Sequence, residues 1–362
     1  MLVVEILVGV MGGLLAVGTL GSAVRTVVVP RGEQTFISRL AILPIRKAFD
    51  AVADRQDDPV RRDSIKARFA PFALMMFPFI WAGGVILGCA GLFWALGVTP
   101  FRDAFVLSGS SLTTLGIRTT TDLPTLVVEI VEGIVGLGLV ALLISFLPTI
   151  YGAFSRREAA VAKLHLRSTG LDGVPSPASL LLRRHQIDSI GEMEQMWTEW
   201  EDWFVEVEET HTSFPILVFF RSPVPERSWV GSAGMALDSA ALYCSLLDVP
   251  RDPRAQLMIR TGTLSLRRVC DFFGFDYDPD PQPTDPISIT RAEFDEIHDR
   301  FAAAGMALVA DRDRAWRAYA GWRVNYDRPL LLLGSFVHAP PIPWATDRPI
   351  EVAPQRLLRR RR

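Results

Sequence analysis

The sequence predicts an all-α membrane protein. Three transmembrane helices, with a re-entrant helix and loop between the second and third, precede a mostly α-helical cytoplasmic domain. Hydrophobic residues make up 49% of the 362 residues, and charged residues only 22%. The apolar residues concentrate in three stretches, each long enough for the roughly 20-residue helix that crosses a bilayer. Beyond about residue 156 no such stretch occurs, and apolar residues recur instead with a helical period.

The overall composition argues against several classes of protein. The net charge of -2 gives no reason to expect a nucleic-acid partner. The three cysteines lack the paired spacing of a disulfide framework or of a CxxC metal site. Since no P-loop, GxGxxG or nucleophile-elbow motif occurs either, we expect no enzyme activity, no catalytic residue, no cofactor and no metal.

The three apolar stretches cover residues 6–24, 69–101 and 133–155. A backbone in hydrocarbon must satisfy its own hydrogen bonds, so each stretch is predicted to be a helix. The first could instead be a cleaved signal peptide, but Glu5 precedes its apolar core in place of a basic residue, which favours a retained anchor. The alternative for the other two is a pair of core helices in a large soluble domain, and their length argues against it.

Basic residues predict the orientation of these helices, because cytoplasmic loops carry an excess of Lys and Arg. The residues between the first two helices include Arg31, Arg39, Arg46, Lys47, Arg55, Arg61, Arg62, Lys66 and Arg68. The next connection carries only Arg102 and Arg118, and Arg156, Arg157, Lys163 and Arg167 follow the third helix. We therefore expect a multi-pass protein of the cell membrane with its N-terminus outside, residues 30–68 inside, residues 98–124 outside and the C-terminal domain in the cytoplasm.

The external connection does not have the pattern of an ordinary loop. Pro100 precedes FRDAFVLSGSS, which predicts a short helix with proline near its first turn. A run of hydroxyls, Ser111 to Gly116, then closes on a glycine. Irregular backbone at membrane depth persists only where it packs in protein or lines a water-filled path, so we expect a re-entrant helix followed by a narrow polar strand. The alternative is a polar turn capped by its own hydroxyls.

This arrangement resembles the two-helix pore module of the pore-loop potassium channels over roughly residues 70–157. Thr113-Thr114-Leu115-Gly116-Ile117 lies where the family has a TTVGY-type signature, and Asp122-Leu123-Pro124 is similar to the D-x-x-P stretch that follows it, displaced and shortened. The resemblance implies a homotetramer that conducts a monovalent cation, potassium before others. Its selectivity filter would comprise Thr113, Thr114, Leu115, Gly116, Ile117 and Arg118.

The chemistry of such a filter explains these residue types. Rings of carbonyl and hydroxyl oxygens replace the hydration shell of the ion, and glycine tolerates the positive φ that aligned carbonyls require. The chain departs from the family where Ile117 replaces an aromatic residue and Arg118 replaces the second glycine. Four guanidinium groups would repel cations unless Arg118 turned outward or paired with an acid, for which the candidates are Asp122, Glu129 and Glu132.

The start of the third helix carries two further sets of candidate residues. Glu129 and Glu132 either flank the filter or reach the headgroup region as interfacial acids. Gly133, Gly136 and Gly138 are either a gating hinge or the small residues that let helices approach closely, with close packing the better supported.

The C-terminal half is predicted to be a helical domain. Helices are expected around a Met193–Val207 apolar stripe, over residues 229–247 and 253–273, after a capping box at Thr290, and around residues 313–325. Residues 215–223 could form a buried strand or a short buried helix.

The same half offers few candidate ligand residues. Glu208 and His211, three apart on one face of a helix, could serve a metal but are more simply explained as hydrogen-bonding residues. Arg260, Arg267 and Arg268 could receive an anion or lie exposed.

Six segments follow from these patterns. They are an N-terminal transmembrane helix (1–29), a basic cytoplasmic connection (30–68), a pore module (69–157), a linker (158–178), a cytoplasmic helical domain (179–350) and a basic tail (351–362) that could bind anionic membrane lipid. Residues 155–178 are first basic and then rich in Gly, Pro and Ser, as in a linker or an extension of the third helix. The alternative to a channel is a non-conducting, membrane-anchored scaffold or sensor with a helical interaction domain.

Overall fold

The fold is all-α, as predicted, in the part of the chain that the structure describes. The structure is a computed structural model and describes residues 2–28, 36–170, 173–224 and 227–352. It divides into two compact units, Met1–Gly152 and Ala153–Arg362. Most of the predicted basic tail, together with residues 30–35 of the basic connection, lies outside the described residues.

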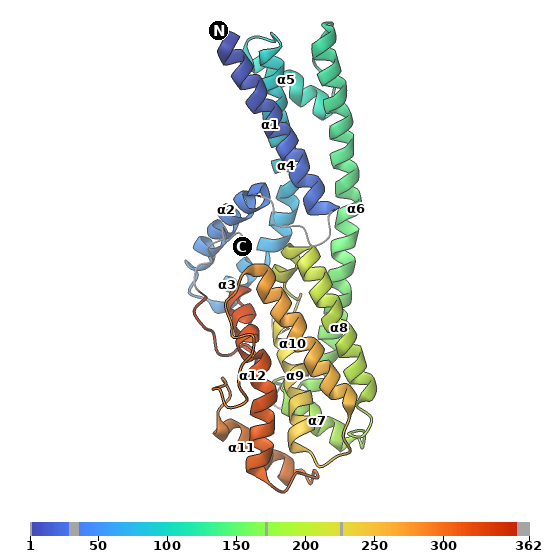
Figure 1. The fold of residues 1–362 in the computed structure, drawn as a ribbon, viewed down its shortest axis with the longest axis vertical. Helices are drawn as coiled ribbons and strands as arrows, with labels where there is room; N and C mark the ends of the chain where they lie inside the picture. Colours follow the sequence, from blue (N-terminus) through green and yellow to red (C-terminus); the bar gives the residue numbers. More distant parts are fainter. Residues whose placement is uncertain (1, 29–35, 171–172, 225–226, 353–362) are drawn as a thin grey trace. The chain divides into compact units, whose positions relative to one another are not determined.

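The first unit contains three helices long and apolar enough to cross a membrane, as in a multi-pass membrane protein. Its elements are α1 (Leu2–Val27), α2 (Phe36–Ala53), α3 (Pro59–Ala67), α4 (Phe69–Ala95), α5 (Phe101–Leu112) and the first part of α6 (Leu123–Ser168) (Figure 1). The three apolar helices, α1, α4 and α6, correspond to the three predicted spans. Helices α2 and α3 were not predicted, because the basic residues of this connection were used only to assign orientation.

Helices α1 and α4 pack with their backbones in direct contact. A Cβ atom on Gly12 would lie 2.4 Å from the carbonyl oxygen of Gly88, and one on Gly88 would lie 2.6 Å from the carbonyl oxygen of Gly12. Small residues that allow this approach are typical of helix pairs in membranes. Helix α1 thus has a specific partner within the chain.

Gly88→Ala is therefore expected to destabilise the membrane unit by about 1–3 kcal/mol, the usual range for an overpacked contact. The new methyl group would meet the backbone of Gly12 and Ala16, which cannot rotate away. The measurement is thermal unfolding of the detergent-solubilised protein. Gly83→Ala on the same helix is the matched control, because a Cβ there meets nothing within 4 Å. Equal losses in both variants would contradict the packing argument.

The second unit consists of the end of α6 and the helices that follow it. These are α7 (Pro177–Gln186), α8 (Glu194–Ser213), the 3-10 helix η1 (Pro215–Phe219), α9 (Trp229–Leu246), α10 (Pro253–Phe273), α11 (Arg291–Ala303) and α12 (Arg312–Phe336). Helix α9 is almost entirely buried and contacts α7, α8, α10 and α12, so it forms the centre of the core (Figure 1).

Several predicted elements of this unit are confirmed. Helices α9 and α10 lie where they were expected. The predicted capping box precedes α11, and in it the Thr290 side chain accepts a hydrogen bond from the amide of Glu293. Residues 215–219 form a short helix rather than a strand. Residues 158–168, assigned to the linker, continue α6 and place Val161 and Leu164 in the core, so the extension of the third helix is the correct alternative there.

The last turns of α6 are attached to α8 and η1 by charged side chains. Arg156 pairs with Glu206 and Lys163 with Glu199, each at 2.5 Å. The partners advance by seven residues in opposite directions, so the two helices run antiparallel. Between these pairs, the buried Arg157 donates to the carbonyl oxygens of Leu217 and Phe220. The C-terminal end of α6 is therefore part of the core of this unit.

Helix α12 is fixed by a fully buried arginine. The Arg323 guanidinium pairs with Asp238 of α9 at 2.5 Å and with Asp327 at 2.7 Å, and it also donates to the carbonyl oxygen of Trp344 at 2.9 Å. Burial disfavours the charged guanidinium, but the two carboxylates outweigh burial and raise the pKa of Arg323 well above its usual range. Asp238 also accepts from the hydroxyl of Tyr326 at 2.8 Å. The cluster joins α9, α12 and the segment after α12.

Arg323→Met is expected to cost the second unit about 3–5 kcal/mol, because it leaves two buried carboxylates without their cation. Chemical unfolding followed by tryptophan fluorescence measures the loss. Arg314→Met on the exposed face of the same helix is the control and should change stability by less than about 0.5 kcal/mol. A small effect of Arg323→Met would mean that the cluster does not stabilise the fold.

Candidate functional site

The short helix predicted after Pro100 is present as α5, which packs against α4 and contacts α6 through Ser108 and Leu112. The hydroxyl oxygen of Ser108 lies 2.5 Å from a carboxylate oxygen of Glu132 on α6. One turn further along both helices, a Cβ on Gly136 would lie 1.9 Å from the carbonyl oxygen of Leu112. Because both contacts advance by four residues, α5 and α6 run in the same direction here.

This parallel arrangement fixes the course of the chain between the two helices. Gly136 lies 13 residues after Leu123, which is about 20 Å along α6 at 1.5 Å per residue. Helix α5 therefore ends far from the start of α6, and residues 113–122 must run back along both helices to reach it. The candidate filter residues lie at the beginning of this return segment.

The predicted strand does not begin at Thr113. The hydroxyl of Thr113 donates to the carbonyl oxygen of Gly109 at 2.5 Å, and the amides of Thr114 and Leu115 donate to Ser111 and Ser110. Thr113 and Thr114 thus close the last turn of α5, as in the alternative of a polar turn capped by its own hydroxyls. The prediction of a strand from Thr113 is wrong, because these groups find acceptors on the preceding helical turn.

The residues after this turn are exposed in the protomer. Thr114 and Gly116 have positive φ values of 56° and 66°, a region that favours glycine. The side chains of Leu115 and Ile117 are 66% and 73% exposed. Two apolar side chains and a stretch of backbone are therefore left uncovered at the point where the chain turns back.

Arg118 pairs with an acid that the sequence analysis did not consider. Its guanidinium lies 2.9 Å from a carboxylate oxygen of Asp103, in the first turn of α5. The hydrogen bond from Arg118 lowers the pKa of Asp103 below its ordinary value. The three predicted partners are engaged elsewhere. The sequence placed Asp103 in the first turn of a helix, where a carboxylate is favoured, but gave no sign that this turn lies beside Arg118.

The three acids at the start of α6 have different surroundings. Asp122 caps the helix, accepting from the hydroxyl of Thr125 at 2.8 Å, and Glu129 accepts from the amide of Thr120 at 3.3 Å. Glu132 is only 2% exposed and lies between helices. Its carboxylate is therefore covered by side chains and backbone of the same chain.

The three candidate glycines of α6, Gly133, Gly136 and Gly138, also differ from one another. A Cβ on Gly136 would collide with the backbone of Leu112, whereas one on Gly133 would make ordinary contact at 3.5 Å and one on Gly138 would meet nothing within 4 Å. Close packing is thus required at Gly136 alone of the three.

Gly136→Ala should displace the end of α5 and lower the unfolding temperature of the solubilised protein, with a cost of about 1–3 kcal/mol. Gly138→Ala is the matched control and should be neutral or slightly stabilising, because alanine favours a helix. If Gly138→Ala proved the more damaging substitution, flexibility of α6 rather than helix packing would be the role of these glycines.

The candidate groups of the second unit are occupied by structural contacts. Glu208 accepts from Arg268 at 2.8 Å, whereas His211 contacts Arg157 at 3.0 Å, so the two do not share a ligand. Burial, followed by the nearby Arg157 charge, lowers the pKa of His211 well below its ordinary value. Arg267 donates to the carbonyl oxygens of Asn325 and Pro279. Among the described residues, no group of three or more His, Cys, Asp or Glu lies close enough to hold a metal ion.

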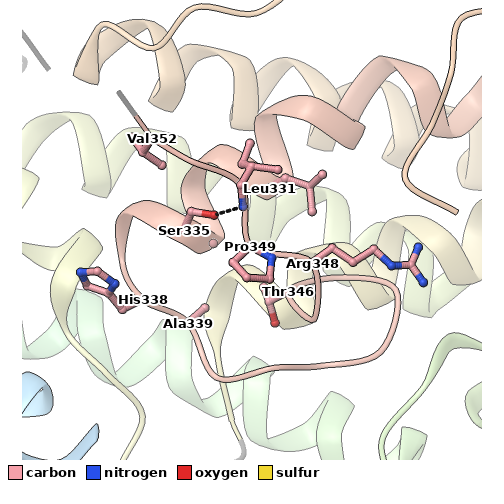
Figure 2. A pocket seen from close by; sticks show the side chains of 10 residues that line it. Leu331, Ser335, His338, Ala339, Thr346, Arg348, Pro349 and Val352 are labelled. Atoms are coloured by element: carbon pink, nitrogen blue, oxygen red, sulfur yellow. Dashed lines mark hydrogen bonds between the residues drawn. The ribbon is translucent and has the colours of Figure 1, made fainter. Parts of the chain in front are cut away.

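A cavity of about 420 Å³ lies beside the end of α12 and the segment that follows it (Figure 2). Its polar side chains serve the fold. Ser335 accepts from the amide of Ile350 at 3.0 Å, and Arg348 bonds to Ser288 and Glu293. The Thr346 hydroxyl donates to the carbonyl oxygen of Pro340 and accepts from the amide of Ile342. His338 and apolar side chains, including Leu331 and Val352, complete the lining.

Comparison with known proteins gives no relative. No protein-family model, no curated protein and no solved structure matches this chain.

Proposed function

We propose that the chain is a subunit of a homotetrameric cation channel, with the return segment and α6 lining the ion pathway. The observation that carries the proposal is the contact of α5 with α6 through Ser108 and Leu112, which places the end of α5 at Gly136. If α6 crosses the membrane from Leu123, the turn after α5 lies about 20 Å from that end, within the hydrocarbon region. In this setting α5 is a re-entrant pore helix.

The exposure of the return segment supports assembly around an axis. Irregular backbone at membrane depth is stable only where protein covers it or water lines it. Within the protomer, Leu115, Gly116 and Ile117 are uncovered. Neighbouring copies would cover the apolar side chains and leave carbonyl oxygens facing a water-filled path. One loop supplies a quarter of each oxygen ring, so four copies are needed, and the resemblance to potassium channels suggests a monovalent cation, potassium first.

The ion pair between Arg118 and Asp103 lowers the electrostatic barrier that Arg118 alone would present to a cation. Four unpaired guanidinium groups at the mouth would repel cations, but each is neutralised by a carboxylate of its own protomer at 2.9 Å.

We also propose the topology that the basic residues favour, with the N-terminus outside and the second unit in the cytoplasm. Reporter fusions after residues 50, 120 and 200 test it, and an external signal at 200 would overturn it.

Purified protein in liposomes is expected to carry a potassium flux and to run as a tetramer. Asp103→Asn should lower the flux several-fold, because it exposes the charge of Arg118 at the mouth. The double variant Asp103→Asn with Arg118→Gln should recover it, since no unpaired charge remains. Thr114→Ala should change the discrimination between potassium and sodium. A silent, monomeric wild type would reject the channel.

A second function is supported by the turn at Thr113. Its hydroxyl is bound to Gly109 and is not free to face an ion. This favours a membrane-anchored scaffold or sensor that uses the same helices without conducting. The two functions differ in a simple measurement, because a conducting pore requires four subunits and a flux, whereas a scaffold requires neither.

A further inference from the structure

A buried carboxylate lies where three helices of the first unit meet. Glu132 of α6 is 2% exposed, and its Oε1 atom lies 2.5 Å from the hydroxyl oxygen of Ser108, itself fully buried on α5. The same hydroxyl lies 3.0 Å from the carbonyl oxygen of Ile86 on α4. The Oε2 atom of Glu132 has no hydrogen-bond partner among the described residues. The thiol of Cys89 on α4 lies near this carboxylate, but a thiol is a weak donor.

Burial of this carboxylate costs free energy unless hydrogen-bond donors compensate for the lost water. A polar group in an apolar region is destabilising when it lacks partners, and Ser108 supplies the one strong donor to Glu132. The Ser108 hydroxyl has a single proton and two acceptors, and the Glu132 oxygen is the closer one. The Ser108–Glu132 bond is thus the polar attachment of α5 to α6 at this depth.

The attachment continues to the return segment. Ser110, two residues after Ser108, exchanges hydrogen bonds of 3.2 Å with the backbone amide and carbonyl of Arg118. The amide of Leu115 also donates to the carbonyl oxygen of Ser110. A shift of α5 along α6 would therefore carry residues 113–118 with it.

We propose that Glu132 is a positioning residue for the ion pathway: through Ser108 it fixes the depth of α5, and through α5 the position of residues 113–118. The inference rests on the proposed function and assigns Glu132 a place behind the pathway rather than in it. Glu132 does not contact the ion. The Glu132–Ser108 bond and the Gly136–Leu112 contact, one turn apart, hold α5 at two points.

The test compares four variants in the full-length protein. Glu132→Gln keeps an acceptor for Ser108, whereas Glu132→Ala and Ser108→Ala each remove one side of the bond. Ser111→Ala is the matched control, because its buried hydroxyl bonds to Leu107 within α5 at 3.0 Å. Each variant is made alone and in an Ile117→Cys background. The readouts are subunit number, the potassium-to-sodium permeability ratio, and the rate at which the introduced thiol reacts with a water-soluble reagent.

Glu132→Ala and Ser108→Ala should each change the labelling rate about tenfold, the effect of losing one buried hydrogen bond, and should reduce the permeability ratio. Glu132→Gln and Ser111→Ala should behave as wild type in both readouts. If Glu132→Ala fails to assemble, Ser108→Ala, which removes a single atom, decides the question. The native cysteines are kept, and the protein without the Ile117→Cys substitution sets the background.

Two results would overturn the inference. One is unchanged labelling in Ser108→Ala, and the other is an equal change in Ser108→Ala and Ser111→Ala, which would show a general loss of packing. A wild type without current rejects the proposed function instead. In that case the labelling rates still decide whether Glu132 sets the position of the loop.

Discussion

The contact between the end of α5 and α6 is the constraint on which the first unit depends. The carbonyl oxygen of Leu112 occupies the space that any side chain at residue 136 would need, and Ser108 meets Glu132 one turn earlier. Two contacts in register determine both the direction of α5 and its position along α6. The position of the return segment follows, because its backbone is bonded to the last turn of α5.

In the second unit, too, contacts between residues far apart in the chain hold the helices in place, and here the contacts are polar ones made by α12. Pro329 lies inside α12 and lacks the amide that would otherwise bond to the carbonyl oxygen of Asn325. Arg267 of α10 supplies two donors to that oxygen, at 3.0 Å and 2.8 Å. The helix therefore continues past the proline, although a sequence pattern would end it there. Arg323 also attaches α12 to α9, because its guanidinium pairs with Asp238 of α9 and with Asp327 of α12.

Much of the fold could be predicted from the sequence because hydrophobic patterns act locally. The three apolar helices, α5 after Pro100, and helices α9, α10 and α11 all lie where periodicity and capping residues predicted them. Helices α2 and α3 were missed because a charged segment between two spans was interpreted only as a topology signal. The site was predicted less well. The turn at Thr113 and the pairing of Arg118 with Asp103 depend on what the preceding helix offers as acceptors and partners.

By itself, the sequence determined that this chain has three helices able to cross a membrane, a short helix between the last two, and a helical C-terminal unit. Length, apolar content and helix-capping residues are sufficient for this, since each acts within a few turns of backbone. Only the tertiary structure decided which of three glycines is required, which acid neutralises Arg118, and that Glu132 is buried. All three findings depend on the register between helices. Residues far apart in the chain determine that register together, so no local sequence pattern predicts it.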